Sequence, residues 1–237
     1  MKLLPPVLLA FNSVATAFAA GPVDVTAPPK NWGVALHGSF DSIDVFGPLN
    51  PLWYLAFSLQ PNLALIAPSL SQVWVEPVEP AVNKQNSSFW FSVNPTHTYA
   101  DPPKDIEVLL VPGGPGSRMG DIDEVIAFVK KTYPGLKYLI YWGRDRSQSW
   151  SIGRQKSHDE QKGLENSYRD GSGCEVGTTS EVTSGLDLIF AYIEEVYGTT
   201  YARDLQGTIE FNRVKDACDD SFAEEHQVPP SGDCSQS

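Results

Sequence analysis

The chain is poor in cysteine and in positive charge. Three cysteines in 237 residues exclude a scaffold built on disulfides. Seventeen Lys and Arg residues against 29 Asp and Glu residues give a net charge of −12. This balance opposes a nucleic-acid partner and an anionic membrane surface, because both require clustered cations. Hydrophobic residues make up 41% of the chain, which excludes a disordered protein and favours one globular domain.

One long apolar run is present, and it lies at the N-terminus. Lys2 precedes the apolar run 3–18, which ends in the small-x-small pattern Ala17-Phe18-Ala19. The run is short and contains prolines, so it favours a cleaved signal peptide over a membrane anchor. We predict a signal peptide at 1–19 and a secreted protein. The alternative is a buried N-terminal element.

Two further features suit a secretory route. Asn86-Ser87-Ser88 is a glycosylation sequon in a polar turn, so Asn86 is a candidate acceptor. Cys218 and Cys234 flank a polar tail and are candidates for a disulfide in an oxidising compartment. That pairing would leave Cys174 as the odd cysteine.

Between residues 31 and 213, short apolar runs alternate with segments of helical periodicity. We expect buried strands at 32–36, 62–66, 106–111 and 137–141, and an edge strand or hairpin at 73–82. We expect helices at 122–133 and 186–197, and two short helices separated by a proline kink at 42–59. This alternation predicts an α/β fold with a mostly parallel sheet covered on both faces. The flanking parts are a Pro-rich lead-in at 20–30 and a polar C-terminal tail at 214–237.

The stretch 142–177 does not fit this pattern. Of its 36 residues, 12 are charged, and Ile, Leu and Val are represented by Ile152, Leu164 and Val176 alone. A structureless loop of this length is unusual inside a compact domain. Three such side chains cannot offset the ordering entropy of the segment. We therefore expect it to be poorly ordered or loosely packed.

A glycine pair follows the strongest predicted strand. The strand 106–111 runs directly into Pro112-Gly113-Gly114. In open α/β sheets, ligands bind at the carboxyl ends of strands, and glycine N–H groups at such a turn can stabilise an oxyanion. Taken alone, the same motif is also typical of a tight turn without function.

The order of several motifs is more specific than any one of them. The sequence carries, in this order, Ser42-Ile-Asp44-Val-Phe-Gly-Pro48, Asn94-Pro-Thr-His-Thr98, the glycine pair, Tyr133-Pro-Gly-Leu-Lys-Tyr-Leu-Ile140, Thr183-Ser-Gly-Leu-Asp187 and Ile193-Glu-Glu-Val-Tyr-Gly198. This set resembles the ThiJ/PfpI (DJ-one) family of the class I glutamine amidotransferase-like superfamily, and most of all its fungal isonitrile-hydratase-like branch. The resemblance covers roughly residues 31–141 and 178–211.

The resemblance implies a flavodoxin-like three-layer sandwich and a cysteine nucleophile on a sharp turn after the strand 137–141. It implies Asp44 as the acid partner of that cysteine, with Gly113 and Gly114 as backbone oxyanion donors. Asp44 is also explained as an acid at a helix N-terminus, favoured by the helix dipole. We interpret His97 as a strand-edge polar contact rather than a catalyst, and the role of His37 stays open.

The nucleophile itself is missing. Where the family pattern continues with a small residue, an apolar residue and Cys, this chain has Tyr141-Trp-Gly-Arg-Asp-Arg146. Cys174 lies in the aberrant stretch and follows no predicted strand, so it is a poor replacement. If the DNA is read one nucleotide later, permitted codons at four places give family-like sequence in the family's order. We therefore predict that 142–177 is an out-of-frame stretch. The alternative is a lineage-specific loop.

By resemblance we expect a Cys-dependent hydratase or hydrolase of a small molecule such as an isonitrile, inactive as written because the nucleophile elbow is missing. The alternatives are a family member without catalysis that binds a ligand or a partner, and a secreted module without pocket chemistry. We expect a small-molecule substrate or ligand and a possible homodimer. We expect neither a metal nor a cofactor, no nucleic acid, and no membrane after signal cleavage.

Overall fold

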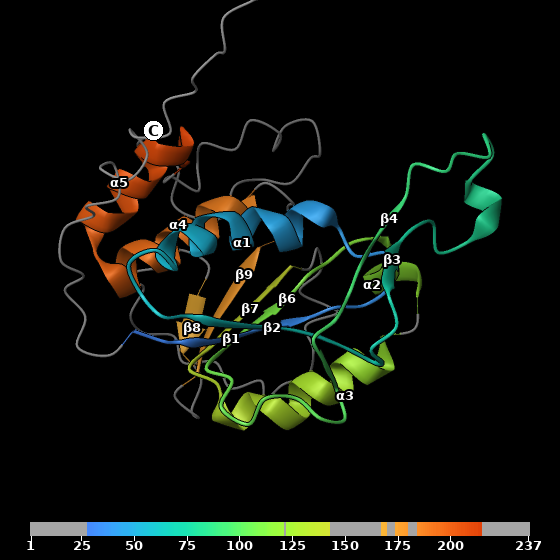
Figure 1. Cartoon of the computed structure of the whole chain (residues 1–237), viewed down its shortest axis with the longest axis horizontal. Helices are drawn as coiled ribbons and strands as arrows, with labels where there is room; N and C mark the ends of the chain where they lie inside the picture. The colour runs from blue at the N-terminus through green and yellow to red at the C-terminus, as the bar shows by residue number, and fades with distance from the viewer. Residues whose placement is uncertain (1–27, 121, 143–166, 170–173, 180–183, 215–237) are drawn as a thin grey trace, which may run out of the picture.

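A single seven-stranded sheet forms the centre of the molecule (Figure 1). The computed structural model describes residues 28–120, 122–142, 167–169, 174–179 and 184–214. In spatial order the strands are β5 (His97–Thr98), β2 (Asn62–Ala67), β1 (Asn31–Ala35), β6 (Val108–Val111), β7 (Tyr138–Trp142), β9 (Glu175–Thr179) and β8 (Ser167–Arg169). All neighbouring pairs are parallel except β8 with β9, which is antiparallel. The predicted mostly parallel α/β sheet is confirmed.

Helices cover both faces of the sheet. On one face lie α1 (Ser42–Leu55), α4 (Ser184–Tyr197) and α5 (Thr199–Ile209), and on the other lies α3 (Asp123–Thr132), followed by the single turn η3 (Tyr133–Gly135) (Figure 1). Alternate residues of β6 divide between the two layers: Val108 and Leu110 pack with the first group, and Leu109 and Val111 with the second. This arrangement is the predicted three-layer sandwich, and it explains why β6 is apolar at every position.

The segment 42–59 differs from its prediction, because α1 is one continuous helix rather than two. Pro48 and Pro51 lie inside it, and both are buried. Each proline lacks the N–H that would donate back into the helix, at a cost of about 3 kcal/mol. Packing of the neighbouring Leu52 and Leu55 into the core offsets this cost. The final helix α5 was not predicted, because its buried stripe consists of only Tyr201, Ala202 and Leu205.

The expectation of loose packing in 142–177 is wrong at its C-terminal end. Residues 174–177 are buried, and β9 pairs with β7 along its whole length from Glu175 to Thr179. Strand β9 is ordered by backbone pairing on both of its sides and by packing of Gly177 against Leu188. The small number of apolar side chains in the sequence did not indicate these contacts. The parts at 143–166 and 170–173 lie outside the described residues. So do the predicted signal peptide, most of the lead-in, and the tail with Cys218 and Cys234.

A second, small sheet projects from the body and is called the arm here. It consists of residues 73–93, with β3 (Val73–Val75) antiparallel to β4 (Phe91–Val93) and the short turn η2 (Pro80–Val82) near its tip (Figure 1). The segment 73–82 was expected to be an edge strand or hairpin, but only Val73–Val75 is a strand there, and its partner β4 lies beyond the segment. Asn86, the glycosylation candidate, is exposed on this arm. Within the described part of the chain, no helix is long and apolar enough to cross a membrane.

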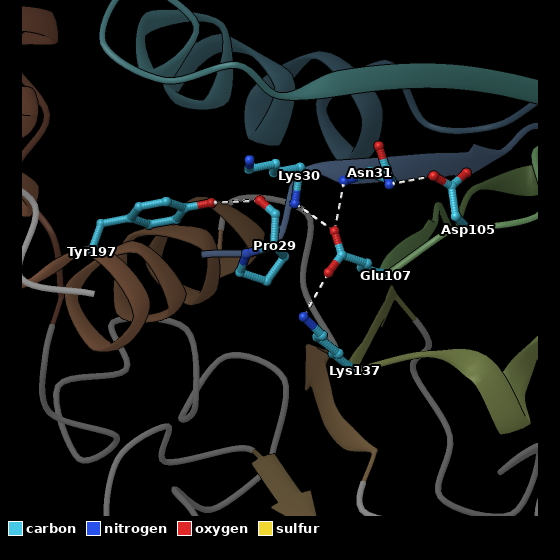
Figure 2. Close-up of polar contacts among 7 residues, drawn as sticks. All are labelled: Pro29, Lys30, Asn31, Asp105, Glu107, Lys137 and Tyr197. Carbon is cyan, nitrogen blue, oxygen red and sulfur yellow. Dashed lines mark hydrogen bonds and ion pairs between the residues drawn. The ribbon is translucent and has the colours of Figure 1, made fainter. Parts of the chain in front are cut away.

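A carboxylate ties three strands together at the amino edge of the sheet. Glu107, just before β6, accepts hydrogen bonds from the backbone N–H groups of Lys30 (2.6 Å) and Asn31 (3.1 Å), and pairs with the Lys137 ammonium at 2.6 Å (Figure 2). Partial burial raises the pKa of Glu107, but the bonds from Lys137, Lys30 and Asn31 outweigh it, so the net pKa is below its usual range. The ionised carboxylate therefore stabilises the fold.

We expect Glu107→Gln to lower the free energy of unfolding by about 1–2 kcal/mol at pH 7, because charge-assisted bonds are lost while Lys137 is half exposed. Since the pKa of Glu107 is depressed in the folded state, the difference from wild type should shrink as pH falls below about 4. Chemical denaturation at pH 7 and pH 3 measures it, with the exposed Glu79→Gln as control. An equal difference at both pH values would contradict an electrostatic origin.

Candidate functional site

The site lies at the carboxyl edge of the sheet, where β1 and β6 end side by side. The chain leaves β1 towards α1 on one face, and it leaves β6 towards α3 on the other face (Figure 1). This reversal is a topological switch point, the place where open α/β sheets bind ligands. His37 follows β1, and Pro112-Gly113 follows β6.

Asp44 and Gly113 meet at this edge, as expected from the sequence. The Gly113 N–H donates to the Asp44 Oδ2 at 2.9 Å. Asp44 comes from the first turn of α1, whose N-cap Asp41 accepts from the Ile43 N–H at 2.9 Å. The Asp44 residue is 2% exposed. The Gly113 N–H is directed at Asp44, so a substrate oxygen would have to displace that carboxyl to receive this donor.

The buried carboxyl of Asp44 is poorly solvated. Burial raises its pKa to about 7, although the Gly113 N–H acts in the opposite direction. Its Oδ1 is buried and has no hydrogen-bond partner among the residues that the structure describes. A protonated Asp44 thus holds an O–H that is available to a group placed beside it.

The glycine loop after β6 is docked tightly on the start of α1. Gly114 has φ +121°, and a Cβ there would lie 2.4 Å from the Asp41 nitrogen, so only glycine fits. The Asp41 N–H donates to the Gly113 carbonyl at 2.9 Å, and the Gly116 N–H donates to the Ser39 carbonyl at 3.0 Å. This docking fixes the position of Asp44 relative to β6.

Trp142 ends β7 beside the Asp44–Gly113 pair. A Cβ on Gly113 would lie 3.1 Å from both the Asp44 Oδ2 and the Trp142 carbonyl oxygen, so Gly113 is held between them. Trp142 is 6% exposed, and its indole ring lies against Gly185 in the first turn of α4. Its Nε1 is buried without a hydrogen-bond partner among the described residues. An indole therefore lies buried at the end of the strand after which the family resemblance requires a cysteine.

Cys174 lies at the opposite edge of the sheet. It precedes β9, and the register pairs Glu175 with Tyr138 at the start of β7, whereas Thr179 pairs with Trp142 at its end. Four strand steps of about 3.3 Å separate the two edges. Cys174 is also 1% exposed. Its placement rules it out as a partner for Asp44 and agrees with the sequence interpretation.

The two histidines have structural contacts. The ring of His37 is buried, with Nδ1 2.9 Å from the Gly38 carbonyl oxygen and Nε2 2.9 Å from that of Pro112. His37 thereby links the ends of β1 and β6, a role that the sequence left open. His97 lies on the edge strand β5 and contacts the Thr96 hydroxyl at 2.9 Å, in agreement with the predicted strand-edge contact.

A cavity of about 400 Å³ opens next to the switch point. Its walls include His37 and Ser39 after β1, Trp74 and Glu76 on the arm, and Gly116 in α2 (Pro115–Met119). Sequence reasoning missed this cavity because its lining comes from three separate stretches, 37–39, 67–78 and 116–122, that share no motif. Within the described ranges, no group of three or more His, Cys, Asp or Glu side chains could hold a metal ion.

Known structures with this arrangement share one fold. A ThiJ/PfpI family protein from Pseudomonas syringae matches with a TM-score of 0.56 at 17% identity, over 95% of this chain and 91% of that chain. A DJ-1 superfamily protein from Salmonella typhimurium matches with a TM-score of 0.52 at 14% identity, over 77% of this chain and 99% of the other. Drosophila melanogaster DJ-1beta matches with a TM-score of 0.50 at 11% identity, over 78% and 99%.

The chain has the fold of ThiJ/PfpI and DJ-1 proteins. No family model matches its sequence, and no curated protein matches it. At 11–17% identity the likeness establishes the flavodoxin-like fold. The activity has to be argued from the residues of the site.

We expect Asp44→Asn to gain stability relative to wild type as pH rises. In the folded chain the carboxyl keeps its proton up to about pH 7, whereas in the unfolded chain it ionises near pH 4. The wild-type free energy of unfolding therefore falls between these values, by about 2–4 kcal/mol. The asparagine Oδ1 still accepts from the Gly113 N–H but does not ionise.

Denaturation at pH 4, 6 and 8 measures this difference. The exposed Asp204→Asn on α5 serves as the control and should show no such trend. A constant difference between Asp44→Asn and wild type across this range would show that Asp44 is ionised throughout in the folded protein.

Proposed function

We propose that this chain carries the framework of a Cys-dependent small-molecule hydratase or hydrolase of the isonitrile-hydratase type and is inactive as written. The observation that carries the proposal is the buried Asp44 carboxyl, held by the Gly113 N–H at 2.9 Å at the carboxyl edge of the sheet. No residue in the described part of the chain brings a thiol to this carboxyl. In this proposal Asp44 is the acid, and its thiol partner is absent from the chain as written.

The chemistry of this carboxyl suits a thiol partner. A protonated carboxyl with its O–H directed at a sulfur stabilises the thiolate, which is the nucleophilic form of cysteine. Asp44 has the burial and the raised pKa that this role requires. The Gly113 N–H already donates to Asp44. The candidate oxyanion donor of the glycine loop is therefore the Gly114 N–H.

We also propose that the stretch from 142 is encoded out of frame and that an in-frame version has a cysteine after Ile140. The family-like sequence that the shifted frame gives at four places supports this proposal. So does the presence of Trp142 at the end of β7, where the family pattern has a cysteine. The buried strand β9 counts against it at residues 174–177. We further propose secretion through the signal peptide at 1–19.

Two versions of the chain should separate these possibilities. The chain as written should show no turnover of an isonitrile or a simple ester. A version with the shifted frame and its cysteine restored after Ile140 should be active. In the restored version, Cys→Ser and Asp44→Asn should each lower kcat by about 10³-fold or more, as removal of members of a catalytic unit does.

Sequencing the messenger RNA across residues 140–178 is the control on the gene. Turnover by the written chain that a thiol reagent abolishes would overturn the proposal of inactivity. A messenger RNA that encodes 142–177 as written would overturn the out-of-frame proposal.

The cavity beside the switch point favours a second candidate, a binding protein without catalysis. Asp44 is not among its lining residues, and its walls combine Trp74 with the polar side chains of Gln72 and Glu76. We expect Ser71→Trp, at the exposed rim, to fill this cavity and abolish binding of small-molecule fragments detected by ligand NMR. Met119→Trp, exposed on α2, is the matched control. Equal fragment binding by both variants would contradict a ligand site in the cavity.

A further inference from the structure

The arm carries the one N-glycosylation sequon of the sequence near its tip, which projects away from the central sheet (Figure 1). Asn86-Ser87-Ser88 is the only Asn-x-Ser/Thr triplet in the 237 residues whose middle position is not proline. Asn94-Pro95-Thr96 has the outer residues of such a triplet, but its proline excludes it. Asn86 has φ +51°, in the left-handed region that asparagine enters more readily than most residues.

The two polar groups of the sequon that matter for attachment are available. Among the described residues, neither the Asn86 side chain nor the Ser88 hydroxyl makes a hydrogen bond, and both residues are exposed. The neighbouring Asn83 differs, because its side chain donates to the Ser87 carbonyl at 2.9 Å and accepts from the Ser87 N–H at 2.8 Å. One asparagine thus holds the turn in shape, and the other presents its amide to solvent.

A bare aromatic ring lies three residues after this amide. Phe89 is 94% exposed. Its N–H donates to the Ser87 Oγ at 3.2 Å, and the Trp90 indole N–H donates to the Ser87 carbonyl at 2.9 Å. These bonds hold the ring-bearing segment against the sequon, so the ring is presented on an ordered loop. An apolar ring left in water forgoes the free energy that burial would supply, and a group attached nearby is able to cover it.

We propose that Asn86 carries an N-linked glycan whose first sugars lie on the Phe89 ring. The inference rests on the proposed secretion and is independent of catalysis at Asp44. A sugar ring has a face of C–H groups, which the electron-rich face of an aromatic ring attracts. Asn86 and Phe89 are at most about 11 Å apart along the chain, within reach of the asparagine side chain and the sugars attached to it.

The tether makes this contact favourable although it is small. The glycan is bound to the same chain, so the stacking on Phe89 is intramolecular and has a high effective concentration. The ring is already held in place, so little further entropy is lost when it is covered. A separate protein would have to bury about 800 Å² of this chain for a stable interface, several times what one phenylalanine ring offers.

The attachment is a transfer from a lipid-linked oligosaccharide. The Asn86 Nδ2 forms a bond to the anomeric carbon of the first N-acetylglucosamine, and the bond from that carbon to the lipid pyrophosphate breaks. The amide loses one proton, and the pyrophosphate leaves with the electron pair of the broken bond. No oxidant or reductant takes part. The Ser88 hydroxyl is the group two positions on that the sequon requires.

Expression of the full chain, with its own residues 1–19, in a secreting yeast tests the site. Protein recovered from the medium should carry one glycan, which peptide N-glycosidase F removes with conversion of Asn86 to aspartate, as mass spectrometry detects. Asn86→Gln and Ser88→Ala should each abolish the glycan. Ser87→Ala, at the middle position of the sequon, is the matched control and should keep it.

The outcomes separate the site from the route. An exported chain without a glycan overturns the proposed site and leaves secretion standing. A chain that stays in the cytosol without a glycan overturns both. Since the readout is the mass of the protein, neither result depends on whether the chain turns over an isonitrile or an ester.

Proton NMR of the glycosylated chain tests where the glycan lies. The ring current of Phe89 should shift protons of the first N-acetylglucosamine upfield relative to the released oligosaccharide, and Phe89→Leu should abolish this shift. Phe57→Leu removes another exposed ring, 59% exposed after α1, and should leave the shift unchanged. Far-UV circular dichroism checks that each variant is folded. Sugar protons without an upfield shift in the wild-type chain overturn the stacking on Phe89.

Discussion

The hydrogen bond from the Gly113 N–H to Asp44 is the contact on which the functional edge of this molecule depends. It joins the end of the central strand β6 to the start of α1, and the glycine loop makes it possible by docking on residues 39–41. Gly114 permits this docking because it has no side chain. Its φ of +121° favours glycine, and a Cβ at this position would collide with the Asp41 nitrogen. Burial at this edge raises the pKa of Asp44 to about 7, although the bond from the Gly113 N–H acts in the opposite direction.

A carboxyl held in this way is costly for the folded chain. Its folded-state pKa lies above its unfolded value, so ionisation at neutral pH opposes folding. Perturbed carboxyls of this kind cluster at functional sites, where the raised pKa serves the chemistry. In this chain the burial of Asp44 still lowers stability at neutral pH. At the end of β7, beside it, lies the buried indole of Trp142. Under the proposed function, this carboxyl is the acid partner of a cysteine that the chain as written lacks.

The central strands could be predicted from the sequence because burial on both faces leaves a continuous apolar run, as at 106–111. The meeting of Asp44 with Gly113 was expected from the family resemblance that the ordered motifs carry. Other features depend on tertiary contacts that no local pattern contains. The prolines of α1 predicted a break, but burial of that helix overrides their local cost. Strand β9 draws its order from pairing with β7 rather than from its own composition. The Glu107 contacts at the amino edge and the walls of the cavity each come from several distant segments.

Helix α1 has two different faces, and Asp44 lies on the inner one. Asp44 points inward to Gly113, whereas its neighbour Ile43 and the nearby Phe46 are exposed on the outer face. The inner face of α1 also contains two prolines, so part of its backbone hydrogen bonding is absent. The docking of the helix start on the glycine loop fixes the Asp44 carboxyl relative to β6, so the geometry of the site depends on this end of the helix staying docked.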